Sequence, residues 1–190
     1  MICGKLEACV ERAIKGHLPD ECDNRKENCI EFSDTRMHAK CEEKKKKYVL
    51  ENTMGKHIVS YRMDGGIVHV DAKVQEGVAK CDYLYVIDTD KPTAVLTELK
   101  GVDVAKAIQQ IDSTLILFNG FFRKCSNVYG RIVVASAVPK LNASPAYVKL
   151  QNKLKNLYRG NLKVASRQMV EKADGLRHNR YLHERLQILL

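Results

Sequence analysis

One segment in the middle of the chain restricts the possible folds more than any other. Two apolar runs follow one another there, separated by an aspartate-rich turn at 88–92; the first run follows Asp82, and the second ends in Glu98-Leu99-Lys100. Because side chains alternate between the faces of a strand, Glu98 and Lys100 share one face while Leu99 points to the other. An antiparallel hairpin through the turn places Asp82 beside Glu98. Two carboxylates and an ammonium are therefore expected at one edge of a sheet.

Periodicity and turn residues divide the rest of the chain into helices and strands. Apolar spacing and capping residues predict helices over 3–15, 34–52, 102–118, 144–160 and 181–190. Apolar and β-branched runs predict strands over 57–62, 67–71, 82–88, 93–100, 131–139 and 162–165. The segment 16–33 is expected to be a loop. This order of elements favours an α/β (α+β) fold with a mixed central sheet.

Positive charge is distributed unevenly along the chain. The 190 residues carry a net charge of +9, and the last third holds most of the excess lysine and arginine, a density that suits contact with a phosphate backbone. The residues expected to make this contact are Arg123, Lys124, Lys149 and Lys153. A separate lysine run, 44–47, lies in the helix expected over 34–52. For the basic residues of the last third, the alternative is a solvated surface that keeps the protein soluble. The lysine run is expected to be a solvated helix face, with a nucleic-acid contact as the alternative.

Cysteine is frequent, but its spacing does not predict a structural metal site. Five of the seven cysteines fall within residues 1–41, together with His17 and His38. Neighbouring cysteines there are more than four residues apart, whereas structural zinc sites usually include two ligands two to four residues apart. Free thiols are therefore expected, with a metal site as the alternative. Residues 1–50 are interpreted as a cysteine-rich helical segment attached to a domain over 51–190.

Several classes of protein are disfavoured by what the sequence lacks. No run of about 18 apolar residues predicts a membrane span. The first residues carry scattered charges rather than the apolar stretch of a secretory signal, so a cytoplasmic location is expected. Neither a Gly-x-Ser-x-Gly nucleophile motif nor a Walker-type phosphate loop is present. Serine-hydrolase chemistry and ATP-driven activity are therefore not expected.

The motif around Glu98 resembles that of the PD-(D/E)XK nuclease superfamily. That motif consists of an aspartate, a variable hairpin and Glu-x-Lys, followed by a helix that often carries glutamine. Asp82, Glu98 and Lys100 match it in this order, and Gln109 and Gln110 fall in the helix that follows. The resemblance implies a restriction-endonuclease-like core, in which a mixed sheet lies between helices in a three-layer α/β/α arrangement.

The resemblance also implies a metal site with assigned roles. Asp82, Glu98 and the backbone carbonyl of Leu99 would hold Mg²⁺ or Mn²⁺, for which oxygen atoms are suitable ligands. Lys100 would orient the attacking water and stabilise developing negative charge. From the following helix Gln109 is assigned to the site, and the alternative is that both glutamines face solvent.

Other acidic residues could extend or replace this set. Glu51, at the end of the helix expected over 34–52, is a candidate for a further acid, although it could simply end that helix. Asp71 could take the place of Asp82. The alternative for the whole set of Asp82, Glu98 and Lys100 is a salt-bridge cluster on the surface of the sheet.

The function implied by the resemblance is that of a metal-dependent endonuclease or exonuclease. DNA is favoured over RNA as the substrate, and a homodimer is compatible with the chain. One alternative is a protein of the same fold that binds nucleic acid or a partner protein without cleaving anything. In that case the basic last third would contact DNA or an acidic partner.

Overall fold

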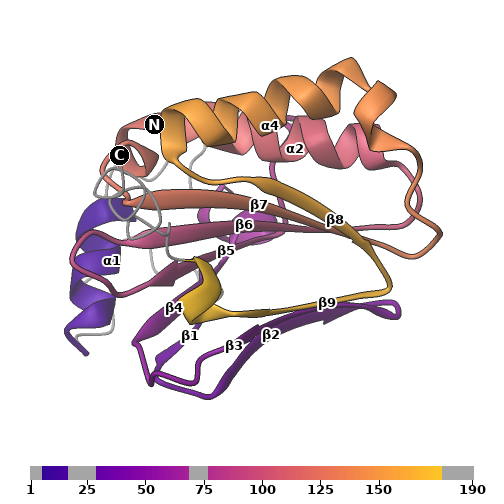
Figure 1. Ribbon diagram of the computed structural model, residues 1–190. Helices are drawn as coiled ribbons and strands as arrows, with labels where there is room; N and C mark the ends of the chain where they lie inside the picture. The colour runs from indigo at the N-terminus through magenta and orange to yellow at the C-terminus, as the bar shows by residue number, and fades with distance from the viewer. Residues whose placement is uncertain (1–5, 17–28, 69–76, 177–190) are drawn as a thin grey trace, which may run out of the picture.

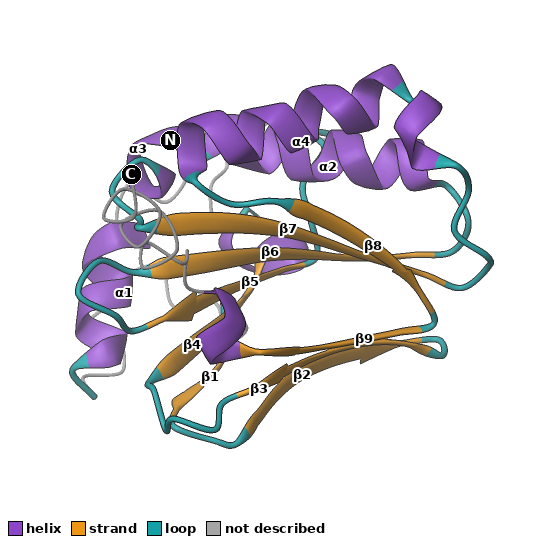
Figure 2. Cartoon of the chain, viewed as in Figure 1, coloured by secondary structure: helices purple, strands orange, loops and turns teal. Residues whose placement is uncertain are grey.

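The computed structural model describes residues 6–16, 29–68 and 77–176 of the chain. Nine strands in this part form two sheets (Figure 2). The larger sheet has the order β1-β4-β5-β6-β7-β8, and its strands are β1 (Ile30–Asp34), β4 (Ile58–Arg62), β5 (Tyr83–Ile87), β6 (Thr93–Lys100), β7 (Asn127–Val134) and β8 (Leu162–Ser166). The smaller sheet has the order β2-β3-β9, with β2 (His38–Glu43), β3 (Lys46–Glu51) and β9 (Gln168–Lys172).

The pairing of neighbouring strands changes once across the larger sheet, from antiparallel to parallel. Neighbouring strands from β1 to β6 are antiparallel, whereas β6, β7 and β8 are parallel. The parallel crossovers are made by two helices, α2 (Val104–Leu117) and α4 (Pro145–Tyr158), and a short helix α3 (Asn119–Phe122) follows α2. The first described helix is α1 (Leu6–Ile14). The expected mixed α/β fold with a mixed central sheet is therefore confirmed.

The helices and the smaller sheet cover opposite faces of the larger sheet (Figure 1). Alternate side chains of each central strand enter different cores. Leu84 and Leu96 pack with Ile111 of α2, whereas Tyr85 and Val95 pack against the smaller sheet. The third layer is thus a β-sheet among the described residues, and the expectation of an α/β/α arrangement is wrong in this respect.

The helix expected over 34–52 is instead the hairpin of β2 and β3. Ala39 and Cys41 are buried while Lys40 between them is exposed, which is the alternation of a strand with one covered face. The chain reverses at Lys44 and Lys45, whose φ angles of 44° and 67° are those of a type I′ turn. Lysine and glutamate favour helices in isolation, but packing against the larger sheet decides the structure here.

The smaller sheet also brings together an early and a late segment of the chain. The expected boundary after residue 50 falls inside β3, and β3 pairs in parallel with β9, a strand that the sequence did not predict. The hairpin expected over 57–62 and 67–71 is not formed by the described residues, because β1 and β5 occupy both edges of β4. Residues 69–71 and the helix expected over 181–190 lie outside the described residues.

The helix expected over 144–160 is confirmed in position and capping. Ser144 accepts a hydrogen bond from the Tyr147 N–H, and Pro145 follows at the first helical position. At the other end Gly160 passes close to β7: a Cβ on it would lie 1.7 Å from the carbonyl oxygen of Val128, so only glycine fits. None of the helices in the described ranges is long and apolar enough to cross a membrane.

Candidate active site

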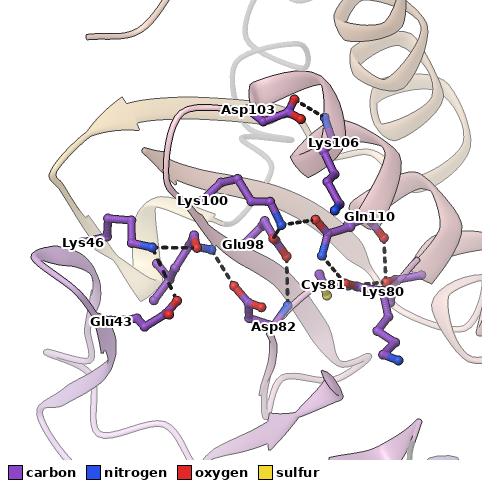
Figure 3. Close-up of polar contacts among 12 residues, drawn as sticks. Glu43, Lys46, Lys80, Cys81, Asp82, Glu98, Lys100, Asp103, Lys106 and Gln110 are labelled. Atoms are coloured by element: carbon purple, nitrogen blue, oxygen red, sulfur yellow. Dashed lines mark hydrogen bonds and ion pairs between the residues drawn. The ribbon is translucent and has the colours of Figure 1, made fainter. Parts of the chain in front are cut away.

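The expected hairpin brings Asp82 and Glu98 together. β5 and β6 pair antiparallel with Tyr83 opposite Thr97, so Asp82 lies beside Glu98 at the end of the pair. The Asp82 N–H donates to Glu98 Oε2 at 3.1 Å, and the Leu99 N–H donates to Asp82 Oδ2 at 2.8 Å. Each carboxylate is thus fixed by the backbone of the other strand (Figure 3).

Lys100 connects this pair to α2. Its Nζ lies 3.2 Å from Glu98 Oε1 and donates to Gln110 Oε1 at 2.6 Å. Gln110 is almost fully buried, whereas Gln109 is exposed on a different side of the helix. Of the two glutamines considered from the sequence, the one that reaches the cluster is therefore Gln110, and the assignment of Gln109 is wrong in geometry. The Lys100 side chain is 23% exposed, so part of it is accessible to water.

Helix α2 also holds the segment that leads into Asp82. Gln110 Nε2 donates to the Lys80 carbonyl at 2.7 Å, and the Cys81 N–H donates to Thr114 Oγ1 at 2.9 Å. The start of the helix is fixed by Asp103, whose carboxylate accepts from the Lys106 N–H at 2.9 Å. The position of Asp82 consequently depends on side chains of α2 as well as on the strand pairing.

The smaller sheet contributes two residues that the sequence did not assign to the site. Lys46 of β3 is only 4% exposed, and its Nζ donates to the Leu99 carbonyl at 3.0 Å. The same ammonium lies 3.4 Å from Glu43 Oε2 at the end of β2. Lys46 thus bonds the carbonyl that was expected to be a metal ligand, as the close-up shows (Figure 3).

Burial makes ionisation of both carboxylates unfavourable. The Glu98 side chain is 1% exposed, and burial, together with the nearby Asp82, raises its pKa to about 8. Burial also raises the pKa of Asp82, and Glu43 adds to this effect. Lys100 and the backbone N–H donors act in the opposite direction without cancelling it. An additional cation would therefore stabilise the ionised form of the cluster.

The donor set is compatible with a small divalent cation. Asp82 and Glu98 offer carboxylate oxygens on adjacent strands, and Mg²⁺ commonly uses one or two carboxylates and keeps several waters. The carbonyl of Leu99 would have to exchange its bond to Lys46 for the metal. The described ranges contain no group of three or more histidine, cysteine, aspartate or glutamate side chains that could hold a metal ion. The fit therefore rests on two carboxylates and a carbonyl.

The other acidic candidates do not join the cluster. Glu51 lies at the opposite end of β3 from Lys46, where it pairs with His38 and Lys172 across the smaller sheet. Asp71 lies outside the described residues. Glu43 is consequently the further acid that approaches Asp82, since its charge contributes to the raised pKa of Asp82.

The expected nucleic-acid contacts have mixed surroundings. Lys153 forms an ion pair with Asp112, Lys124 forms one with Glu7, and Arg123 Nε donates to Asn119 Oδ1 at 3.1 Å. Lys149 is exposed on α4. Three of the four residues are thus engaged within the protein.

The described cysteines are not arranged for metal binding. Cys41, Cys81 and Cys125 are buried in different parts of the two cores. Burial raises the pKa of Cys41 and of Cys125 to about 12, so both remain protonated thiols. Cys3 and Cys22 lie outside the described residues.

No family model, curated protein or solved structure matches the chain. The family resemblance drawn from Asp82, Glu98 and Lys100 therefore stays a prediction. The geometry and electrostatics of the cluster are what support a function.

Proposed function

We propose that the protein is a metal-dependent nuclease that hydrolyses phosphodiester bonds, with DNA as the substrate. The observation that carries this proposal is the convergence of Asp82, Glu98 and Lys100 at one end of the β5–β6 pair. Asp82, Glu98 and Glu43 outnumber the two lysines beside them, Lys100 and Lys46, and the pKa values of Asp82 and Glu98 are raised. Such perturbed groups are more frequent at functional sites than elsewhere in proteins.

Asp82, Glu98 and the Leu99 carbonyl would hold Mg²⁺ or Mn²⁺. When bound, such an ion supplies neutralisation of phosphate charge and lowers the pKa of a coordinated water. The protein's own contribution is to keep the two carboxylates in place, through backbone N–H donors from facing strands. This arrangement requires little reorganisation when a substrate binds.

Lys100 would act on the water and on the phosphate. Its side chain is partly exposed, and its ammonium is held between Glu98 and Gln110, so the direction of the ammonium is set by two acceptors. A cation in this position attracts a phosphate oxygen and stabilises the negative charge that develops during hydrolysis. Gln110 would act as a positioning residue, because it also bonds the Lys80 carbonyl that precedes Asp82.

A second candidate function is nucleic-acid binding without cleavage. The buried Lys46 ammonium donates to the Leu99 carbonyl and lies near Glu43, so the protein carries a cation of its own beside the site. If that lysine permanently replaces a metal, the same fold would bind a phosphate backbone without cutting it. This candidate predicts metal-independent, salt-sensitive binding without turnover.

One set of reactions separates the two candidates. The purified protein is incubated with linear, circular, single-stranded and branched DNA and with RNA, in Mg²⁺, Mn²⁺ or EDTA. Glu98→Gln and Lys100→Ala are compared with Lys163→Ala, which removes another lysine that forms an ion pair with a glutamate. We expect cleavage with metal alone, its loss in the first two variants and its retention in Lys163→Ala. Retarded DNA without products, in the presence of metal, would favour the binding protein.

A further inference from the structure

Four exposed cations occupy backbone positions that do not favour them: Arg159, which ends α4, and three that lie in two turns, at 44–45 and at 167. Lys44 and Lys45 have φ angles of 44° and 67°, and Arg167 has a φ angle of 62°. Left-handed backbone is usually left to glycine or asparagine, because a larger side chain crowds its own peptide group there. At the three turn positions the side chain is exposed and packs into no core. Their presence is therefore not explained by stability of the fold.

The two turns lie at the same end of the molecule as the candidate active site. Lys44 and Lys45 immediately precede Lys46, whose Nζ donates to the Leu99 carbonyl. The Arg167 N–H donates to the Val134 carbonyl at 2.7 Å, and Val134 pairs with Lys100. The Lys47 N–H donates to the Arg167 carbonyl at 2.9 Å, which joins the two turns. Figure 1 shows both turns beside the C-terminal ends of β6 and β7, from which the chain continues towards α2 and α4.

These cations are largely unneutralised. The nearest acid to Lys44 is Glu43, at 3.9 Å, and the Lys44 side chain is 86% exposed. Lys45 and Arg167 form no ion pair within the ranges that the structure describes. By contrast, Lys153 and Lys124 of the expected basic surface already have acidic partners. Positive charge accessible to a ligand is thus available at the two turns.

We propose that Lys44, Lys45 and Arg167 form a basic turn surface that binds the phosphate backbone of a nucleic acid beside the candidate active site. This inference rests on the proposed function for its substrate class. Ionised carboxylates at the site repel a polyanion, so a chain bound across it requires cations close by to hold it there. The surface lies on the side of the smaller sheet and differs from the expected contact through Lys149 and Lys153 of α4.

The proposal predicts an unusual combination of effects for one variant. Lys44→Asn, Lys45→Gly and Arg167→Asn together place residues that suit left-handed turns, so the urea midpoint of the protein should rise. The same variant should lose at least about 30-fold in affinity for DNA in 0.1 M salt. For duplex DNA its plot of log affinity against log salt should become shallower by about 2.7, since each of three phosphate contacts contributes about 0.9.

The measurement is fluorescence anisotropy with labelled single-stranded and duplex DNA, in EDTA so that no cleavage occurs. Arg159→Asn is the matched control, because Arg159 is also exposed with a left-handed φ of 52°. Its carbonyl accepts from Asn127 Nδ2, at the far end of β7, about 23 Å from Val134 along the strand. Arg159→Asn should gain stability with unchanged affinity. Lys149→Gln should have a smaller effect on affinity than the triple variant.

The outcomes separate this inference from the proposed function. Reduced affinity in the triple variant of a protein that never cleaves DNA leaves the basic turn surface standing and removes the nuclease. Unchanged affinity in a protein that does cleave DNA overturns the basic turn surface alone. A larger loss in Lys149→Gln than in the triple variant, or absence of DNA binding by the original protein, also overturns it.

Discussion

Within the described parts of the chain, charged side chains are buried in two places, and the two groups are balanced differently. The first group is the candidate active site, with Asp82 and Glu98 beside Lys100. The second lies between the sheets, where Glu171 of β9 contacts Arg131 of β7 and Lys163 of β8. In the first, Asp82 and Glu98 share Lys100, while the neighbouring Lys46 is paired with Glu43; in the second, two cations share one carboxylate.

The balance of charge has opposite effects on the two glutamates. Burial works against ionisation of Glu171, but the nearby Arg131 and Lys163 outweigh it and lower the pKa of this carboxyl. Burial and the neighbouring Asp82 raise the pKa of Glu98 to about 8. Arg131 is fully buried and also donates to Asn161 Oδ1 at 2.9 Å. The carboxylate between the sheets is therefore already neutralised by its neighbours, whereas the candidate active site still favours binding of a cation.

The largest predicted effect concerns the group between the sheets. Glu171→Ala should lower the free energy of unfolding by about 3–5 kcal/mol, because it leaves the buried Arg131 guanidinium without its carboxylate. Urea denaturation followed by circular dichroism measures this change. Asp82→Ala is the comparison and should cost far less. A cost below about 1 kcal/mol for Glu171→Ala would show that this ion pair does not hold the two sheets together.

The second prediction concerns the pH dependence of stability without metal. Between about pH 4.5 and pH 8 the folded protein binds the Glu98 proton more tightly than the unfolded chain does, so stability decreases as pH rises through this window. Glu98→Gln removes the decrease and should stabilise the metal-free protein by several kcal/mol at pH 9, with little change near pH 4.

Urea midpoints in EDTA at several pH values measure this effect. Glu171→Gln serves as the comparison with the opposite sign, since a lowered pKa stabilises the ionised form and its contribution disappears at acid pH. If the stability of Glu98→Gln depends on pH as that of the original protein does, ionisation of the Glu98 carboxyl is not what destabilises the metal-free protein.

The third prediction is that a divalent ion supplies the positive charge that the candidate active site needs. With the ion bound, this group should stabilise the folded protein, as the group between the sheets does without it. At a few tens of times its Kd, Mg²⁺ or Mn²⁺ should stabilise the protein at pH 8 by about 2 kcal/mol, by binding the folded form alone. Thermal unfolding with increasing metal measures the shift. Glu98→Gln should abolish it, and Lys163→Ala should retain it. A shift of equal size in Glu98→Gln would indicate that the metal binds elsewhere.

The sequence was sufficient to predict the elements that are determined locally. The hairpin of β5 and β6 follows from an aspartate-rich turn between two apolar runs, and α4 follows from its Ser144-Pro145 start. The meeting of Asp82 with Glu98 needed only strand alternation and the register of that hairpin. These parts of the fold and of the site depend on neighbours in the sequence.

The smaller sheet could not be predicted in this way, because its stability comes from distant contacts. The segment of β2 and β3 is rich in helix-forming lysine and glutamate, and its strand structure depends on pairing with β9 and packing on Tyr85. For the same reason the approach of Lys46 to the Leu99 carbonyl was not foreseen. The available signal was the alternation of Ala39 and Cys41 with charged residues, together with a possible two-residue turn at 44–45.

The smallest predicted effect tests how the candidate active site is held in position. Gln110→Ala removes the acceptor that directs the Lys100 ammonium and the donor to the Lys80 carbonyl. If the protein is a nuclease, kcat should fall about tenfold, equivalent to about 1.4 kcal/mol in the transition state, with KM changed less. Gln109→Ala is the matched control on the exposed side of α2 and should leave the rate unchanged.

Single-turnover cleavage with saturating enzyme measures the chemical step directly. A rise in KM with kcat unchanged would assign Gln110 to substrate binding. Equal effects of Gln109→Ala and Gln110→Ala would contradict the positioning role. No residue between the sheets should behave like Gln110. Lys163→Ala is therefore measured for both stability and cleavage rate, and it should change the stability alone. Because Lys163 bonds the glutamate that already has Arg131 as a partner, its loss leaves that carboxylate paired and the rim of β5 and β6 undisturbed.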